Sequence, residues 1–444
     1  MDAETRQEGS VSLGVFDAEA SWRSSSLARL PAVFSSNTSL AELALDELLF
    51  PWQEGCGNLL TLLSIDTHHL QYLNTLRKGV YHSSVFDSVE AWRLSGSPEN
   101  LFSVLSDSCC FPSQWDRLQL SPYAVTREFD HFASMQTGQG TWPPIDSVVT
   151  ANSKVFSSEC SSAFEPAIRS AVVRKLDAIR QFQTENSLET ILLKDPFGVS
   201  GRGQYLIRDE ASLERIEHYL GQQLRDGLEI ELVVEAFTPF VKEFSSYFYL
   251  AADGSEKCRG IRQTLTRGPR YMGSVVPEIS LLELLDRTEY YSVIGKYLGK
   301  IHELGYHGPI CFDSAILESG EVRSVIEINA RKSLGSIALD LALYLQSLGT
   351  DGDFHSTDLT VMKAVSMPDL LKRLEEAALL WSPDRSAGII PLTSGSICFN
   401  GKNAAPRRSR LYYGVVGPNP AARDEVQVSF MAWCAAYQSF RITQ

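Results

Sequence analysis

A glycine-rich segment between two short apolar runs limits the folds open to this chain. Residues 189–194 (ETILLK) read as a strand, residues 198–203 (GVSGRG) as a loop, and residues 204–208 (QYLIR) as a returning strand. The loop lacks the Gly-Lys-Ser/Thr ending of a Walker A loop, and its lysine, Lys194, precedes the glycines. It also joins two strands, whereas the dinucleotide-binding fingerprint needs a strand-to-helix turn. The pattern therefore predicts a hairpin with a glycine-rich tip.

This hairpin has the groups that a phosphate-binding loop needs. Glycines allow backbone N–H groups to approach phosphate oxygens closely, and Ser200 could add a hydroxyl donor. Lys194, at the end of the incoming strand, could place a positive charge on a phosphate. A glycine hairpin beside a lysine also occurs as plain structure, so the loop alone leaves both interpretations open.

A second pair of predicted strands, within residues 308–331, carries oxygen ligands on one face. Asp313 lies on the first strand, and a turn containing glycine leads to the second, VRSVIEINAR. Glu327 and Asn329 are two residues apart on that second strand and therefore share a face. Two carboxylates and an amide oxygen suit Mg²⁺, which binds a few protein oxygens and then nucleotide phosphates.

Arg331 follows at the same two-residue spacing and projects to the same side in this pattern. A guanidinium there could stabilise a phosphoryl group during transfer. For Asp313 alone, a surface strand with alternating polar residues is the favoured explanation. It explains Glu-x-Asn-x-Arg less well, because asparagine is a poor strand former.

The remaining pattern is that of a mixed α/β protein with strands and helices in alternation. We expect helices at residues 164–182, 209–224 and 281–305, and strands at residues 228–237, 244–255 and 258–268.

Charge and composition exclude several partners. The chain has 444 residues, a net charge of -14 at pH 7 and an isoelectric point of about 5.1, which disfavours nucleic acid and anionic membranes. No apolar run approaches the length of a transmembrane helix. One local basic cluster, residues 407–410, is most simply a solvated loop.

The cysteine pattern and the N-terminal residues favour a cytoplasmic protein. Eight cysteines are sparse for this length and form no Cys-x-x-Cys pair, so a zinc site is improbable. The sequence begins MDAETRQEGS, which is too polar and acidic for a signal peptide. We expect residues 1–28 to be polar and loosely ordered at their start.

The order of these parts resembles the ATP-grasp enzymes. A lysine and a glycine hairpin, then the strand VVEAF (233–237), then Asp…Glu-x-Asn-x-Arg follow one another between residues 152 and 336. The resemblance implies an α/β (α+β) ATP-grasp fold preceded by an α/β pre-ATP-grasp domain and followed by a small mixed α/β region. The implied divisions are a polar segment (1–28), the N-terminal domain (29–146), subdomain A with the glycine-rich lid (147–235), subdomain B with the metal site (236–345) and the C-terminal region (346–444).

The resemblance also implies a nucleotide site. Two lysines, Lys154 and Lys194, would contact the ATP phosphates, and a mobile glycine loop would cover them. A hinge strand would bind adenine and a further glutamate the ribose. The residues concerned are Ser200, Gly201, Arg202 and Gly203 in the loop, Glu235, Ala236 and Phe237 in the hinge, and Glu243. A solvated loop lysine is the plain alternative for Lys154.

The family's metal ligands correspond to Asp313, Glu327 and Asn329, with two Mg²⁺ ions expected and Mn²⁺ a possible substitute. Its arginine that helps bind the transferred phosphate and the acyl group corresponds to Arg331, so Arg331 and Lys194 are the expected catalytic residues. Arg262 is a further candidate for a substrate carboxylate, although a salt bridge on the strand face explains it equally well.

The implied reaction is ATP-dependent formation of an amide or peptide bond between a small acid and an amine, through an acyl phosphate. The layout is most similar to peptide and amino-acid ligases of natural-product pathways, many of them homodimers. Two alternatives stay open. One is a ligase that loads an amino acid onto a carrier protein, for which the basic cluster at residues 407–410 would suit an acidic carrier. The other is a non-catalytic nucleotide-binding module.

Overall fold

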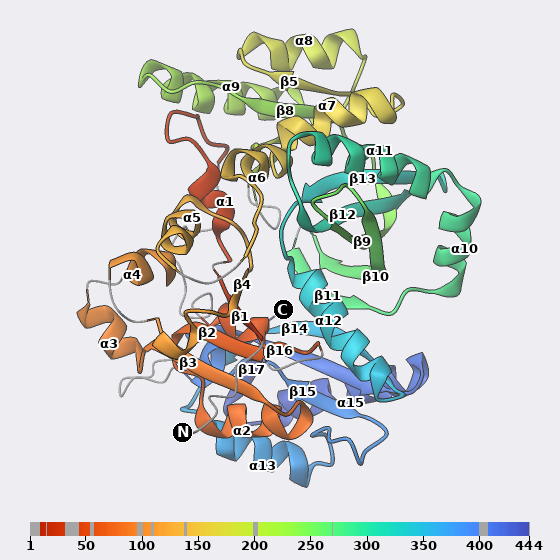
Figure 1. Ribbon diagram of the computed structural model, residues 1–444. Coiled ribbons are helices and arrows are strands. Elements are labelled where there is room, and N and C mark those ends of the chain that lie inside the picture. The colour runs from red at the N-terminus through yellow and green to blue at the C-terminus, as the bar shows by residue number, and fades with distance from the viewer. Residues whose placement is uncertain are drawn as a thin grey trace.

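Three β-sheets organise the chain (Figure 1). The computed structural model describes residues 9–14, 16–31, 44–53, 57–95, 101–107, 111–136, 140–198, 203–268, 270–398 and 407–443. Helices accompany each sheet, so the fold class is mixed α/β, as expected. Within these ranges, no helix is both long and apolar enough to cross a membrane.

The N-terminal sheet has parallel strands in the order β3-β2-β1-β4. Every residue of β2 is buried, as expected for an apolar strand in a parallel sheet covered on both faces. The strands are β1 (Ser10–Leu13), β2 (Gly57–Leu63), β3 (Val80–Phe86) and β4 (Gln119–Pro122). The helical segments are α1 (Ala18–Trp22), η1 (Leu45–Leu49), α2 (Thr67–Leu76), α3 (Val89–Leu94), α4 (Leu101–Asp107), η2 (Ser113–Trp115) and α5 (Arg127–Ser134).

Part of the expected polar segment 1–28 forms regular structure, whereas its start, residues 1–8, lies outside the described residues. Residues 10–13 form β1, which lies inside the sheet and pairs with both β2 and β4. Val11 and Leu13 are completely buried. Strand partners on both sides supply hydrogen bonds to this short segment, so it forms a strand despite its polar surroundings in the sequence.

The second sheet contains the predicted glycine hairpin. Its strands are β5 (Ser170–Val173), β6 (Ile191–Lys194), β7 (Gln204–Ile207) and β8 (Leu232–Ala236), in the order β5-β8-β6-β7. The hairpin is confirmed, since β6 and β7 pair antiparallel from Ile191↔Ile207 to Lys194↔Gln204. The helices of this region are α6 (Ile145–Ala151), α7 (Lys154–Phe164), α8 (Asp177–Glu185) and α9 (Glu210–Arg225).

The helix expected at residues 164–182 is wrong. Helix α7 ends at Phe164, and Pro166 follows two residues later. Proline disfavours a helical residue before it and lacks the N–H that a helix interior needs. The chain instead forms β5, which pairs with β8, before α8 begins at Asp177.

The third sheet is long and mainly antiparallel, in the order β13-β12-β9-β10-β11-β14-β16-β15, with β17 paired to β14. Its strands are β9 (Phe240–Leu250), β10 (Glu256–Arg267), β11 (Arg270–Val275), β12 (Gly308–Leu317), β13 (Val322–Asn329), β14 (Asp351–Val361), β15 (Gly388–Pro391), β16 (Arg407–Gly417) and β17 (Phe440–Ile442). The hairpin predicted within residues 308–331 is therefore confirmed. The helices are α10 (Ile279–Arg287), α11 (Tyr290–Glu303), α12 (Leu334–Ser347), α13 (Met367–Glu376), α14 (Gly395–Cys398) and α15 (Pro420–Ala436).

Two further expectations in this region are corrected. The single helix at residues 281–305 is divided into α10 and α11, because Thr288 has extended backbone angles (φ −103°, ψ 173°). The break lets Leu285 of α10 and Tyr290 of α11 both be buried. Residues 407–410 begin β16 rather than form a loop, and Arg410 pairs with Asp358.

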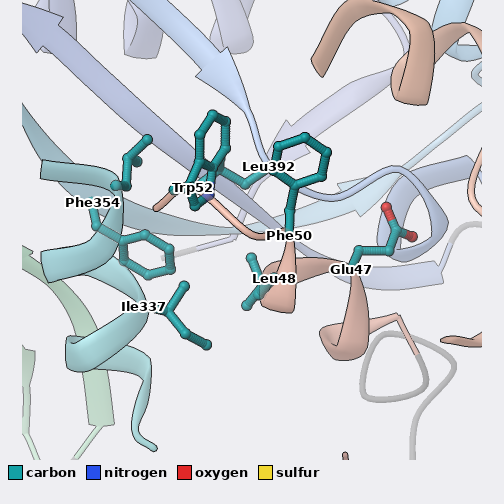
Figure 2. Close-up of a pocket in the computed structure, with 8 residues that line it drawn as sticks. Glu47, Leu48, Phe50, Trp52, Ile337, Phe354 and Leu392 are labelled. Carbon is teal, nitrogen blue, oxygen red and sulfur yellow. The ribbon is translucent and has the colours of Figure 1, made fainter. Parts of the chain in front are cut away.

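Figure 2 shows an apolar junction between the N-terminal domain and the C-terminal part of the long sheet. Leu48, Phe50 and Trp52 meet Ile337, Phe354 and Leu392, and all six are buried. Glu47 points its carboxylate away from this group and accepts hydrogen bonds from the backbone N–H groups of Ser394 and Gly395. The junction is therefore a packing contact whose one carboxylate already has partners.

Candidate active site

The three predicted metal ligands lie together on neighbouring strands. Asp313 of β12 stands opposite Glu327 of β13 in the ladder, and Asn329 follows two residues further along β13. Asn329 Nδ2 donates to Asp313 Oδ2 over 2.9 Å, and Ser245 Oγ of β9 donates to Asp313 Oδ1 over 2.6 Å. Alternation along paired strands therefore brings the two carboxylates and the amide to one place.

This position is electrostatically negative. Burial, reinforced by the charge of Glu327, raises the pKa of Asp313 to about 6. Glu243 of β9 stands next to Ala315 in the β12–β9 ladder, and burial also raises its pKa.

Lys154 connects this acidic group to the glycine hairpin. It is the first residue of α7 and is buried, so it is not a solvated loop lysine. Its Nζ donates to Glu327 Oε1 over 2.9 Å and to the carbonyl oxygen of Gly198 over 2.6 Å. The lysine thus lies between the β13 carboxylate and the start of the glycine loop.

A buried ion cluster lies beside this lysine. Glu235 of β8 accepts from Lys194 over 2.6 Å through Oε1 and from Arg323 over 2.8 Å through Oε2. Burial alone would raise the pKa of Glu235, but the charges of Lys194 and Arg323 outweigh it and lower the pKa to about 2. Burial lowers the pKa of Lys194, and Glu235 partly offsets that effect.

These charged side chains line a small polar cavity. Three cations and one anion therefore converge on the cavity, together with hydroxyl groups from α7 and β5. The lining residues are Lys154, Ser157, Ser158, Ser161, Ser170, Lys194, Val233, Glu235, Arg323, Val325 and Ile326.

Arg331 reaches side chains beside the N-terminal sheet, while its charge still acts on Asp313 and Glu327. The residue is buried and forms an ion pair with Glu19 of α1. Its Nη1 donates to the hydroxyl of Tyr123, which follows β4, over 3.2 Å. The guanidinium also stands 5.5 Å from the centre of the Tyr123 ring.

Comparison with solved structures identifies the fold. The biotin carboxylase domain of a Hydrogenobacter thermophilus 2-oxoglutarate carboxylase, solved with MgADP, aligns with a TM-score of 0.54 and 13% identity over 98% of this chain and 90% of that one. Biotin carboxylase from Campylobacter jejuni, in a β-γ-ATP complex, aligns with a TM-score of 0.53 and 11% identity over 98% of this chain and 92% of that one. This chain has the ATP-grasp fold.

Sequence comparison gives a narrower match. A relative from Niallia circulans, a [butirosin acyl-carrier protein]–L-glutamate ligase, is 26% identical over 153 residues. That match spans 34% of this chain and 35% of the relative. No family model matches the chain.

The predicted adenine-binding hinge, residues 235–237, lies at the end of β8 and directly after it. The backbone N–H of Ala236 donates to Arg169 and that of Phe237 to Thr190, so both donors are already used. In this segment the Phe237 side chain is exposed, while the two N–H groups already have partners.

The glycine loop is described only at its base. Ser200, Gly201 and Arg202 lie outside the described residues. Gly203 has a φ of +77°, and a Cβ there would come within 2.9 Å of the Asp195 side chain, so glycine is needed at this position. Its carbonyl oxygen accepts from the Asp195 N–H over 2.7 Å, which closes the loop.

Arg262 lies in a separate buried network. Its Nη2 donates to the carbonyl oxygen of Gly352 over 2.7 Å and approaches Asp353 Oδ1 at 3.4 Å. Arg423 pairs with the other oxygen of Asp353 over 2.7 Å. The contacts of Arg262 are therefore those of a buried salt bridge, which the sequence analysis gave as the alternative to binding a substrate carboxylate.

Three residues of this region were not found from the sequence. Arg323 contacts Glu235, Glu19 contacts Arg331, and Arg23 pairs with Asp195 at the base of the glycine loop over 3.0 Å. Each pair joins residues far apart along the chain, so no local spacing indicates it. Arg323 does stand on the predicted second strand, four residues before Glu327, and this was the one available signal.

Proposed function

We propose that this chain, which has the ATP-grasp fold, is an ATP-dependent ligase that joins a small carboxylic acid to an amine. The acid would be an amino acid or a peptide, and the products an amide, ADP and phosphate. The contact of Lys154 with both Gly198 and Glu327 carries this proposal, because it joins the phosphate-binding loop to the carboxylates expected to hold metal.

The residues at this position fit a magnesium ion. Asp313, Glu327 and Asn329 supply carboxylate and amide oxygens, which Mg²⁺ prefers, and nucleotide phosphates normally complete such a shell. In the described part of the chain, this position included, no group of three or more His, Cys, Asp or Glu side chains is arranged to hold a metal ion, so the amide of Asn329 and the phosphates would have to complete the shell. A bound Mg²⁺ would offset the negative charge of the phosphates.

The proposed reaction has two steps, each conserving atoms and charge. An oxygen of the acid attacks the γ-phosphorus of ATP, and the bond from phosphorus to the β–γ bridging oxygen breaks, which releases ADP. The amine nitrogen then attacks the acyl carbon of the acyl phosphate. The carbon–oxygen bond breaks, phosphate leaves, and the amine loses a proton.

The side chains of this chain have separate roles in that reaction. Lys154 and Lys194, both buried, would contact phosphate oxygens, where a low local dielectric strengthens their attraction. Arg331 would hold the carboxylate through its planar pair of N–H groups. The glycine loop would cover the site and keep water from hydrolysing the acyl phosphate.

The experiment that tests this proposal is an ADP-release screen with hydroxylamine present. Wild-type protein is incubated with ATP, Mg²⁺ and a panel of amino acids and small acids. We expect ADP and a hydroxamate with at least one acid, because hydroxylamine traps an acyl phosphate. Absence of hydroxamate with every acid, together with ATP binding, would support the non-catalytic alternative instead.

A carrier protein is a second candidate for the acceptor. The Niallia circulans relative is described as a ligase acting on an acyl-carrier protein, although the match covers about a third of each chain (34% and 35%). A basic surface on this chain supports the same idea. Arg270 and Arg410 both pair with Asp358, at 2.6 and 2.9 Å.

This basic surface is larger than the sequence cluster suggested. Arg267 and Arg408 are exposed, and both charges act on Asp358, so four arginines surround one carboxylate. Arg267 ends β10 only three residues after Thr264, which stands opposite Glu243 in the ladder. An acidic carrier could therefore dock beside the candidate site.

Other expectations stay predictions. They are the number of metal ions, the use of Mn²⁺, a homodimeric state, a cytoplasmic location, a role in a natural-product pathway, and the division into segments 1–28, 29–146, 147–235, 236–345 and 346–444.

A further inference from the structure

The N-terminal parallel sheet has a switch point where its strand order reverses. The chain runs from β1 outward to β2 and β3, then returns to the other side of β1 as β4. In open parallel sheets, ligands bind outside the carboxyl ends of the strands on either side of such a reversal. Here those ends are Leu13 of β1 and Pro122 of β4, and the N–H of Tyr123 donates to Leu13 over 2.8 Å.

Three charged or polar side chains meet just beyond these two strand ends. Glu19 comes from α1, which follows β1, and Tyr123 directly follows β4. Arg331 reaches the same place from the end of β13 in the long sheet. All three are buried, with 6%, 4% and 8% of their surfaces exposed. The switch point of one sheet therefore faces the arginine expected to hold the acid.

The contacts among these groups are incomplete. Glu19 pairs through Oε1 with Arg331, but its Oε2 has no hydrogen-bond partner among the described residues. The Nε of Arg331 is likewise buried without a partner in the described ranges. Buried polar atoms without partners are unfavourable and usually signal a function or a missing ligand.

We propose that Glu19 and Arg331 together form the receptor for an α-amino acid, with Glu19 binding its ammonium group and Arg331 its carboxylate. This inference rests on the proposed function. The ion pair has the charge pattern that complements a zwitterion, so each member would exchange its internal partner for the oppositely charged group of the ligand. The unpartnered Oε2 and Nε are the atoms available for this exchange.

The proposal predicts discrimination by charge. An acid without an α-ammonium group would pair with Arg331 and leave the Glu19 carboxylate buried and unpaired. A site whose buried polar groups are left without partners rejects such an analogue strongly, by factors far above those available from apolar contacts alone.

The test compares each amino acid that gives a hydroxamate with the matching acid that lacks the α-ammonium group, such as L-glutamate with glutarate or L-alanine with propionate. We expect wild-type kcat/KM to favour the amino acid by roughly 100-fold or more. Glu19→Gln should lower that ratio to below about 10-fold, mainly by raising KM for the amino acid.

Two further variants make the result interpretable. Glu47→Gln neutralises another buried carboxylate of the same domain, outside this site, and should leave the ratio unchanged. Glu19→Asp keeps the charge and should keep the discrimination with a higher KM. Thermal unfolding of each variant checks folding. If a variant does not fold, the wild-type ratio of kcat/KM for the amino acid to that for the matching acid still tests the proposal.

Each contrary outcome has a distinct meaning. Equal use of amino acids and their matching acids by the wild type would overturn this inference and leave the ligase proposal standing. An equal loss for both kinds of acid in Glu19→Gln would make Glu19 a support for Arg331 only, which also overturns it. No hydroxamate with any acid would overturn the proposed function and, with it, this inference.

Discussion

The Nζ atom of Lys154 donates to Gly198, at the start of the glycine loop, over 2.6 Å and to Glu327 of β13 over 2.9 Å. One buried cation therefore links the two parts of the chain that the sequence analysis singled out separately. Because Lys154 begins α7, its position depends on the packing of that helix between the second sheet and β13.

Lys154→Met should weaken the use of ATP. In the proposed reaction Lys154 contacts phosphate, so its loss should remove stabilisation of the transferred group, and we expect kcat/KM for ATP to fall by roughly 100-fold. The measurement is steady-state ADP release at saturating acid. Lys175→Met, at an exposed lysine between β5 and α8, is the matched control and should leave this value unchanged. Equal values for the two variants would contradict the role of Lys154.

Glu235→Gln should destabilise the fold strongly. The change leaves Lys194 and Arg323 buried without their shared carboxylate, and breaking such a cluster costs roughly 3 kcal/mol or more of unfolding free energy. Urea denaturation measures it. The control is Glu231→Gln, which breaks a more exposed pair with Arg174 and should cost less than about 1 kcal/mol. Similar losses in both variants would show that the cluster has little effect on stability.

The same carboxylate should contribute a pH dependence. The folded pKa of Glu235 is about 2 against an ordinary value of 4.5, so the folded state binds this proton less readily than the unfolded chain. Its contribution to stability is therefore complete above about pH 4.5 and is lost as the pH falls toward 2. The lost contribution is on the order of 3 kcal/mol.

Glu235→Gln should flatten this acid limb of the stability curve, measured by urea denaturation from neutral pH downward. Glu231→Gln should retain the limb of the wild type. An unchanged slope in Glu235→Gln would place the acid sensitivity elsewhere in the molecule.

Charge reversal on the basic surface tests the carrier acceptor. Arg408→Glu should slow transfer to an acidic carrier protein by roughly 10-fold or more, with a weaker dependence on salt, because attraction between opposite surfaces speeds encounter. Transfer to a small amine or to hydroxylamine should not change. Arg385→Glu, in the turn before β15, is the control for charge alone. Equal rates of carrier transfer in wild type and Arg408→Glu would count against docking on this surface.

The parts of the site that follow a local repeat were predictable from the sequence. Asp313, Glu327 and Asn329 meet because side chains alternate along paired strands, and the hairpin turn lies within the same short segment. The position of Lys194 was predictable too, because the apolar run before it has the pattern of a strand. That run forms β6, which pairs with β7 and β8 and ends at Lys194.

The remaining contacts depend on the meeting of distant segments. Glu19 and Arg331 are joined across two sheets, and Arg323 meets Glu235 only because β13 packs near β8. No sequence spacing indicates such pairs. The helix expected at residues 164–182 is a different kind of error, because Pro166 was a local signal that outweighed the helical periodicity around it.

Transfer of an oxygen isotope tests the central claim, an acyl phosphate, most directly. The acid that gives a hydroxamate in the screen is labelled with ¹⁸O in its carboxylate and converted to amide with ATP, Mg²⁺ and the amine. Activation through an acyl phosphate predicts one ¹⁸O in each phosphate released, with ADP as the other product. Glu327→Gln should abolish the release of labelled phosphate and of ADP. Phosphate without ¹⁸O, or label found in AMP, would contradict the account.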